Sequence, residues 1–218
     1  MNRLMIAVRC GSRLLAVGVG AALVASIAAS PVQAQLRGHG GPVRAVAVAP
    51  DGRSAISGSF DTSVIRWSLV RNTADQVLRS HDSAVNAVAI LPDGRFVTAG
   101  EDGRIAVWVP GAERPATVFE GHEGPVVALA VSPDGATLAS ASWDRTVRLW
   151  ALRGGAPRVL TGHEQNVNGV AFLPDGRPVS AGYDATLRIW RGDEARVIPL
   201  PAPLNAVAVA PDGEIAAA

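Results

Sequence analysis

The chain has 218 residues, a formal net charge of +1 and 48% hydrophobic residues, which is enough apolar material for a sizeable core. A near-neutral chain without a basic run argues against a nucleic-acid partner, because that affinity depends mainly on neutralising phosphates. Low-complexity segments and charged tails are also absent from the sequence, so nothing in it indicates a disordered interaction tail.

The first 34 residues are typical of a secretory signal peptide. They contain Arg3, Arg9 and Arg13 without any acid, then the apolar run Leu14–Ala29, and an A-x-A-like cleavage site at Val32–Ala34. The alternative is an uncleaved membrane anchor. The run of 16 residues is shorter than the roughly 20 that a spanning helix needs, so we expect cleavage. This predicts a periplasmic or secreted protein that is not inserted in a membrane after cleavage.

Cleavage would change the chemistry that is available to the mature chain. The formal charge would become −2, and Cys10, the only cysteine, would be lost. The mature chain would then have no disulfide, no thiolate nucleophile and no thiolate metal site. Because Cys10 precedes the apolar run rather than ending it, the segment does not predict a lipoprotein.

The elements predicted after residue 34 are short strands in a repeating order. A first short strand is expected at Gln35–Arg37. Then follow Val43–Val48, Arg53–Gly58, Val64–Trp67 and Asp75–Arg79; Val85–Ile90, Arg95–Gly100, Arg104–Trp108 and Ala116–Glu120; Val126–Val131, Ala136–Ala141, Thr146–Trp150 and Pro157–Leu160; Val167–Phe172, Arg177–Gly182, Thr186–Trp190 and Ala195–Leu200; and finally Leu204–Val209. No window shows the 3.6-residue period of a helix.

A Pro-Asp-Gly turn follows the first strand of every group, at residues 50–52, 92–94, 133–135, 174–176 and 211–213. Proline presets the first turn position, aspartate hydrogen-bonds the local backbone, and glycine accepts a positive φ. Each such turn lies between β-branched or small apolar runs. The five turns therefore predict five β-hairpins.

Four polar positions also recur with a period near 41 residues. A histidine is followed by a Ser or Thr, by an aspartate 21 or 22 residues after the histidine, and by a tryptophan six residues after the aspartate. The four sets are His39–Ser57–Asp61–Trp67, His81–Thr98–Asp102–Trp108, His122–Ser140–Asp144–Trp150 and His163–Ser180–Asp184–Trp190.

This period and the GH…D…W order resemble the WD40 repeat, in which four strands make one propeller blade. The resemblance covers residues 35–218 and implies an all-β, WD40-type β-propeller with four complete four-stranded blades and a partial fifth. The implied divisions are a signal peptide (1–34), a closing strand and loop (35–40), blades at about 41–80, 81–121, 122–162 and 163–201, and a partial blade (202–218).

A ring of four and a half blades would leave a bare sheet edge, which soluble proteins avoid. We therefore expect the sequence to be a fragment of a larger ring, such as one of seven blades. The alternative is that separate chains complete the ring by association.

The resemblance implies that each polar set is a structural tetrad in which the four side chains hydrogen-bond together. The alternative is four Ser-His-Asp catalytic triads. A nucleophile needs an exposed hydroxyl beside an oxyanion hole, whereas buried tetrad hydroxyls are consumed by their network. No histidine outside the tetrads is left to bind a metal, and no Cys-x-x-Cys-His haem attachment is present. The prediction is a protein that is not an enzyme and has no cofactor.

The resemblance also places seven side chains on the narrow face of the ring, where a partner binds. They lie before each tetrad aspartate or beside the first valine of an inner strand: Arg44, Phe60, Asn86, Glu101, Trp143, Asn168 and Tyr183. Aromatic side chains with Arg and Asn suit a hot spot for a protein or peptide. The alternative is that the aromatics merely cap the blade ends.

The function predicted from the sequence is a non-catalytic scaffold that binds a protein or peptide in the periplasm. A second hypothesis is the propeller part of an electron-transfer protein, because similar exported bacterial chains can continue into a c-type cytochrome domain. Haem c would then require a Cys-x-x-Cys-His beyond Ala218. A third hypothesis, a propeller enzyme, would need further His or acidic residues converging on the central channel, and we find none.

Overall fold

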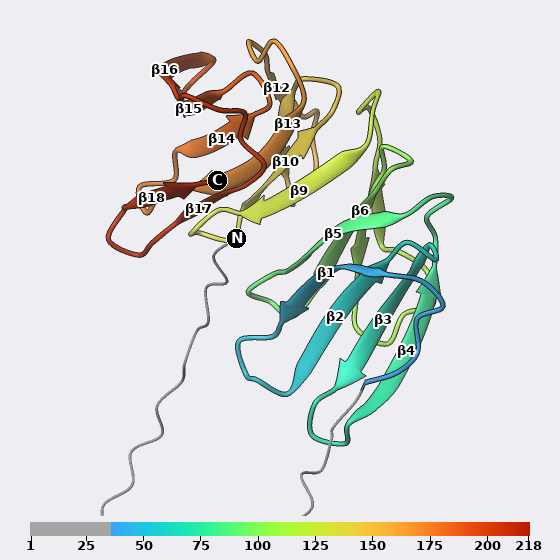
Figure 1. Cartoon of the computed structure of the whole chain (residues 1–218). Helices are drawn as coiled ribbons and strands as arrows, with labels where there is room; N and C mark the ends of the chain where they lie inside the picture. Colours follow the sequence, from blue (N-terminus) through green and yellow to red (C-terminus); the bar gives the residue numbers. More distant parts are fainter. Residues whose placement is uncertain (1–35) are drawn as a thin grey trace, which may run out of the picture. The chain divides into compact units, whose positions relative to one another are not determined.

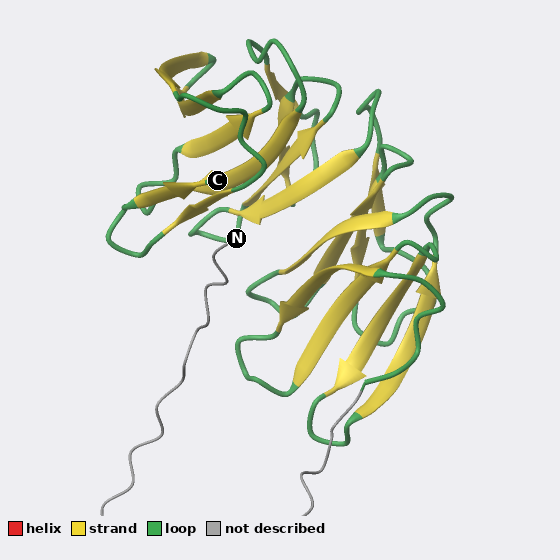
Figure 2. Ribbon diagram, in the orientation of Figure 1, coloured by secondary structure: helices red, strands yellow, loops and turns green. Residues whose placement is uncertain are grey.

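Successive segments of the chain form successive antiparallel sheets. The computed structural model describes residues 36–218, and this range contains strands and loops but no helix (Figure 2). The signal segment and its cleavage site, predicted for residues 1–34, lie outside the described residues.

Four sheets have four strands each, called a to d here in chain order, and each strand pairs with the next (Figure 1). Blade one is β1 (Val43–Val48), β2 (Ser54–Ser59), β3 (Ser63–Ser68) and β4 (Thr73–Arg79). Blade two is β5 (Val85–Ile90), β6 (Phe96–Gly100), β7 (Ile105–Trp108) and β8 (Thr117–Phe119). Blade three is β9 (Val126–Val131), β10 (Thr137–Ser142), β11 (Val147–Ala151) and β12 (Arg158–Leu160). Blade four is β13 (Val167–Phe172), β14 (Pro178–Gly182), β15 (Thr186–Arg191) and β16 (Glu194–Pro199).

A fifth, partial sheet pairs β17 (Val207–Val209) with β18 (Ile215–Ala217). The predicted all-β fold of four complete blades and a partial fifth is therefore confirmed. The strand predicted at Gln35–Arg37 is not found, because its described residues, Leu36 and Arg37, are not in a strand. A strand needs a hydrogen-bonded neighbour, and none of the described strands pairs with this segment.

The a–b turns follow the chemistry of their Pro-Asp-Gly sequence. In blade one the Asp51 Oδ1 accepts a hydrogen bond from the Arg53 backbone N–H at 2.9 Å. The Gly52 φ angle is +66°, a left-handed conformation that glycine adopts without steric cost. Equivalent aspartate bonds close the other four turns. These turns join strands a and b in register.

Most of the core lies between neighbouring blades, and one smaller cluster, Ala55, Ile65 and Trp67, lies within blade one. Ile56 and Val64 of blade one pack with Phe96 and Trp108 of blade two in one buried cluster. Blades two and three, blades three and four, and blade four and the partial sheet are joined in the same way. A blade that packs between two neighbours therefore buries apolar side chains on both of its faces.

A β-bulge interrupts the start of strand a, the inner strand, in every complete blade. The pairing register shifts at Arg44, Asn86, Val127 and Asn168, the second residues of β1, β5, β9 and β13. A bulge leaves one residue unpaired and re-aims its side chain. Three of these four residues belong to the predicted partner-binding face.

Candidate functional site

The structure brings the four members of each polar set together between strands. In blade three the His122 Nδ1 lies 2.6 Å from the Asp144 Oδ2, and the His122 Nε2 lies 2.7 Å from the Ser140 Oγ. A carboxylate only accepts, so Nδ1 donates, and Nε2 therefore accepts from the serine hydroxyl. The Trp150 Nε1–H donates to the same serine oxygen at 2.8 Å. The serine is thus the hub of a continuous hydrogen-bond chain.

Blades two and four repeat this geometry. The histidine Nδ1 lies 3.0 Å from the carboxylate of Asp102 in blade two and 2.9 Å from that of Asp184 in blade four. The histidine Nε2 lies 2.8 Å from the hydroxyl of Thr98 or Ser180, and each hydroxyl accepts from its tryptophan at 3.0 or 2.9 Å. A threonine therefore serves as well as a serine.

Blade one differs because a fifth side chain lies between the histidine and the aspartate. The His39 Nδ1 lies 2.8 Å from the Ser63 Oγ but 3.4 Å from Asp61, and the Ser63 hydroxyl donates to Asp61 at 2.6 Å. Its Nε2 still meets the Ser57 Oγ at 2.7 Å, which in turn accepts from Trp67 at 2.7 Å. The network stays closed through the added hydroxyl.

Sequence reasoning missed this fifth position, which lies two residues after the aspartate. Thr146 and Thr186 occupy it in blades three and four, and each donates its hydroxyl to the tetrad aspartate at 2.7 Å. Arg104 stands there in blade two and contributes its backbone N–H to Asp102. The signal was available, because a hydroxyl recurs at this position in three of the four repeats.

Hydrogen bonding sets the ionisation of these groups. Burial raises the pKa of Asp144, but hydrogen bonds from His122 and Thr146 outweigh it and hold the pKa well below its usual range. For His163, burial lowers the pKa and the neighbouring Asp184 opposes that only in part. An ionised aspartate and a neutral histidine agree with the donor and acceptor roles given above.

The same contacts leave no reactive group in the sets. The Ser140 and Ser180 side chains are fully buried, and each oxygen both donates to a histidine and accepts from an indole. A buried network that is fully satisfied fixes one packing arrangement. A serine nucleophile needs an exposed hydroxyl, and the buried hydroxyls of Ser140 and Ser180 do not offer one.

Within residues 36–218, no cluster of three or more His, Cys, Asp or Glu side chains could hold a metal ion. A helix that is long and apolar enough to cross a membrane is also not found in that range.

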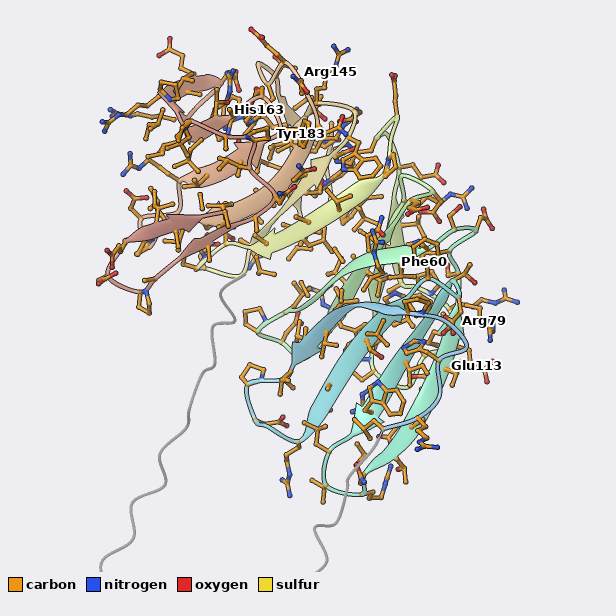
Figure 3. The ribbon with its side chains drawn as sticks, viewed as in Figure 1. Phe60, Arg79, Glu113, Arg145, His163 and Tyr183 are labelled. Carbon is orange, nitrogen blue, oxygen red and sulfur yellow. The ribbon has the colours of Figure 1, made fainter. Side chains whose placement is uncertain are left out.

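Exposed aromatic side chains occupy the b–c turns at one end of the blades. Phe60, Trp143 and Tyr183, called the turn aromatics here, are 49%, 44% and 50% exposed (Figure 3 labels Phe60 and Tyr183). Each precedes a tetrad aspartate, and its backbone N–H donates to the carbonyl of a residue just before strand a, namely Pro42, Pro125 and Asn166. The tetrads therefore fix the turns from which the aromatics project.

Trp143 is held from the neighbouring blade. Its Nε1–H donates to the Asn168 Oδ1 at 3.1 Å, and the Asn168 Nδ2 donates to the Leu204 carbonyl at 2.9 Å. The indole ring keeps a large exposed surface while its N–H is satisfied. A side chain that is fixed before binding loses little conformational entropy when a partner arrives.

The two asparagines of the predicted face serve contacts between blades. Asn86 is buried, and its Nδ2 donates to the Val126 carbonyl of blade three at 3.3 Å. Asn168 makes the corresponding bond to the Leu204 carbonyl, in the segment that leads into the partial sheet. The amide nitrogens of both asparagines are thus engaged within the chain, whereas the turn aromatics keep large exposed surfaces.

Arg44 and Glu101 complete the predicted set. The Arg44 guanidinium lies over the Phe60 ring, with its central carbon 5.2 Å from the ring centroid. This is cation–π geometry. Glu101 is half-buried, and its backbone N–H donates to the Ala84 carbonyl. The predicted set therefore combines three aromatic rings with one cation and one carboxylate, and the exposed Arg145 lies in the same turn as Trp143.

Comparisons with known proteins agree with this architecture. The family model described as "WD domain, G-beta repeat" matches residues 30–68, 73–109, 113–151 and 155–191. Among solved structures, the crystal structure of the WD40 beta propeller domain of Doa1 is 30% identical over 83% of this chain, with a TM-score of 0.73. The chain spans 61% of the length of that domain. A search of curated proteins found no match.

Proposed function

Because the chain belongs to the WD40 repeat family, we propose that it is a non-catalytic scaffold that binds a protein or peptide through its turn aromatics. Propellers of this family typically serve as protein-interaction scaffolds. The observation that carries the proposal is the exposure of Phe60, Trp143 and Tyr183 from corresponding turns of a hydrogen-bonded framework. Large aromatic rings on a rigid backbone are the usual anchors of protein interfaces.

Trp143 and Tyr183 come from neighbouring blades, so one partner segment can contact both. Trp143 is the better anchor, because Asn168 already holds its indole. Arg44 and Glu101 add one charge of each sign, which favours a partner with mixed rather than uniformly charged side chains. The proposed surface has no basic run, so a nucleic acid is not proposed as the partner.

A capture experiment tests this proposal. The immobilised protein is incubated with an extract of the source organism, the captured protein is identified by mass spectrometry, and its Kd is measured with purified components. The double variant Trp143→Ala, Tyr183→Ala removes two expected hot-spot side chains, so its Kd should be about thirtyfold higher or more than that of the wild type. The matched control is Val118→Ala, Val159→Ala, which shortens exposed side chains on the outer strands and should change the Kd less than twofold.

A folded double variant that keeps the wild-type Kd would contradict the proposed surface. Folding is checked by far-UV circular dichroism and by the unfolding midpoint of each variant. If the control variant loses binding instead, the outer strands and not the turn aromatics carry the contact.

The periplasmic or secreted setting is also part of the proposal, and it rests on the sequence of residues 1–34. Its support is the basic start, the short apolar run and the small residues before Gln35. Intact-mass measurement of protein from the source organism should give a chain that begins at Gln35. A mature chain that retains Met1 would oppose export by signal cleavage.

A further inference from the structure

A groove lies between the a–b turns of blades three and four, at the end of the blades opposite the turn aromatics. Its volume is about 420 Å³, within the range of pockets that hold small ligands. Leu149, Phe172, Pro178 and Trp190 supply apolar walls. The proposed function leaves this groove without a role.

The a–b turns of blades three and four pack less closely at the turn glycine than those of blades two and three. Between blades two and three, Pro92 packs so closely that a Cβ added at Gly135 would lie 2.9 Å from the proline Cγ. At Gly176, the corresponding residue of blade four, an added Cβ would meet no atom within 4 Å. The space left between these turns is the groove.

Three arginines line the groove and retain free donors. Arg158 and Arg177 pair with Asp193 and Asp175 through Nε alone, each at 2.8 Å. Their terminal N–H groups make no hydrogen bond to any residue of the described range. The Arg191 side chain makes neither an ion pair nor a hydrogen bond within that range, although its backbone belongs to strand β15. The groove thus offers guanidinium groups that fit a planar carboxylate bidentately.

The groove carboxylates are already engaged by their own turns. The Asp175 Oδ1 accepts from the Arg177 backbone N–H at 3.1 Å, and the Asp134 Oδ1 accepts from the Ala136 backbone N–H at 3.0 Å. The three arginines of the lining also outnumber its two aspartates, so the lining carries a net positive charge. This favours a ligand that brings acceptors with negative charge.

A similar groove of about 410 Å³ between blades one and two provides an internal comparison. The residue that corresponds to Arg158 there is Gln76, and the residue that corresponds to Arg191 is Val109. Arg66 does line this groove, but its Nη1 donates to Asp75 at 3.2 Å. The two grooves thus have similar volumes, but Arg66 is the one arginine that lines the groove between blades one and two, whereas three arginines line the groove between blades three and four. Of these three, Arg191 has no side-chain ion pair in the described range.

We propose that the groove between blades three and four binds a short acidic peptide segment, with carboxylates on the arginines and an apolar side chain against the walls. Carboxylates flanking one apolar residue satisfy both features of the groove. Because the groove and the turn aromatics lie at opposite ends of the blades, the two sites can be occupied together.

The test uses the probe acetyl-Asp-Phe-Asp-amide and its neutral twin acetyl-Asn-Phe-Asn-amide, titrated into the purified protein by calorimetry at low salt. We expect the acidic probe to bind at least about tenfold tighter than its twin, as for one charge-assisted hydrogen bond. Arg191→Glu should abolish this preference. The matched control Arg95→Glu reverses an exposed arginine on the a–b turn of blade two and should leave the Kd within twofold.

Equal affinity for the two probes would overturn the proposal, as would an equal loss in Arg191→Glu and Arg95→Glu. Arg191→Gln removes the charge without reversing it and serves if the reversed variant is unstable. The Trp143→Ala, Tyr183→Ala variant should bind the acidic probe as the wild type does. A loss there would assign the probe to the turn aromatics instead.

Discussion

Replacing Ser140 by alanine removes the hub of the polar set in blade three. The side chain is fully buried and bonds the His122 Nε2 at 2.7 Å and the Trp150 Nε1 at 2.8 Å. Without it, the indole N–H has no acceptor and the imidazole nitrogen has no donor. Each unsatisfied buried group costs about 1–3 kcal/mol, and Ser140→Ala leaves two of them. We therefore expect this variant to lower the free energy of unfolding by about 3 kcal/mol.

Equilibrium urea unfolding followed by far-UV circular dichroism measures this loss. Ser140→Thr is the matched control, because Thr98 fills the same position in blade two, and it should cost less than about 1 kcal/mol. In Ser140→Ala, Trp150→Phe the orphaned indole donor is also gone, so the double variant should lose less than the sum of the two single losses. A loss below about 0.5 kcal/mol in Ser140→Ala would refute the hub role.

Three further outcomes are expected. Because the pKa of His163 is lowered in the folded chain, the unfolded chain takes up a proton there at higher pH, and the free energy of unfolding should decrease as the pH falls below about 6.5. An unfolding midpoint that stays constant or increases as the pH is lowered from about 7.5 to about 5.5 would oppose this. Gly103→Ala should cost at least about 2 kcal/mol in urea unfolding, since the φ angle is +75° and the new Cβ would lie 2.8 Å from the His122 carbonyl oxygen. Thr62→Gly should raise the free energy of unfolding by about 1 kcal/mol, because threonine holds a φ of +67° in the corresponding turn; an unchanged or lower value would count against strain at that turn.

Much of the fold follows from local signals in the sequence. The Pro-Asp-Gly turns mark each hairpin because proline, aspartate and glycine each satisfy a different demand of a tight turn. The recurring histidine, hydroxyl, aspartate and tryptophan mark each blade because the loop before strand a, strand b, the b–c turn and strand c must meet there. Both patterns have fixed spacing, so they can be found without a structure.

The arrangement between blades could not be predicted in the same way. The sequence placed Asn86 and Asn168 on the partner-binding face, but a bulge in the inner strand aims both amides at the next blade. The bond from Trp143 to Asn168 likewise joins residues 25 positions apart in different blades. Pairing of this kind depends on how sheets stack, and no local pattern reports it.

The central claim is that the side chains that hold the blades differ from those offered to a partner, and two adjacent residues test it most directly. Asp144 accepts hydrogen bonds from His122, Glu123 and twice from Thr146, whereas Trp143 donates one bond to Asn168 from an exposed ring. In urea unfolding we expect Asp144→Ala to lose about 3 kcal/mol and Trp143→Ala about 1 kcal/mol or less. An equal or larger loss for Trp143→Ala would contradict the claim, because it would make the exposed indole part of the framework.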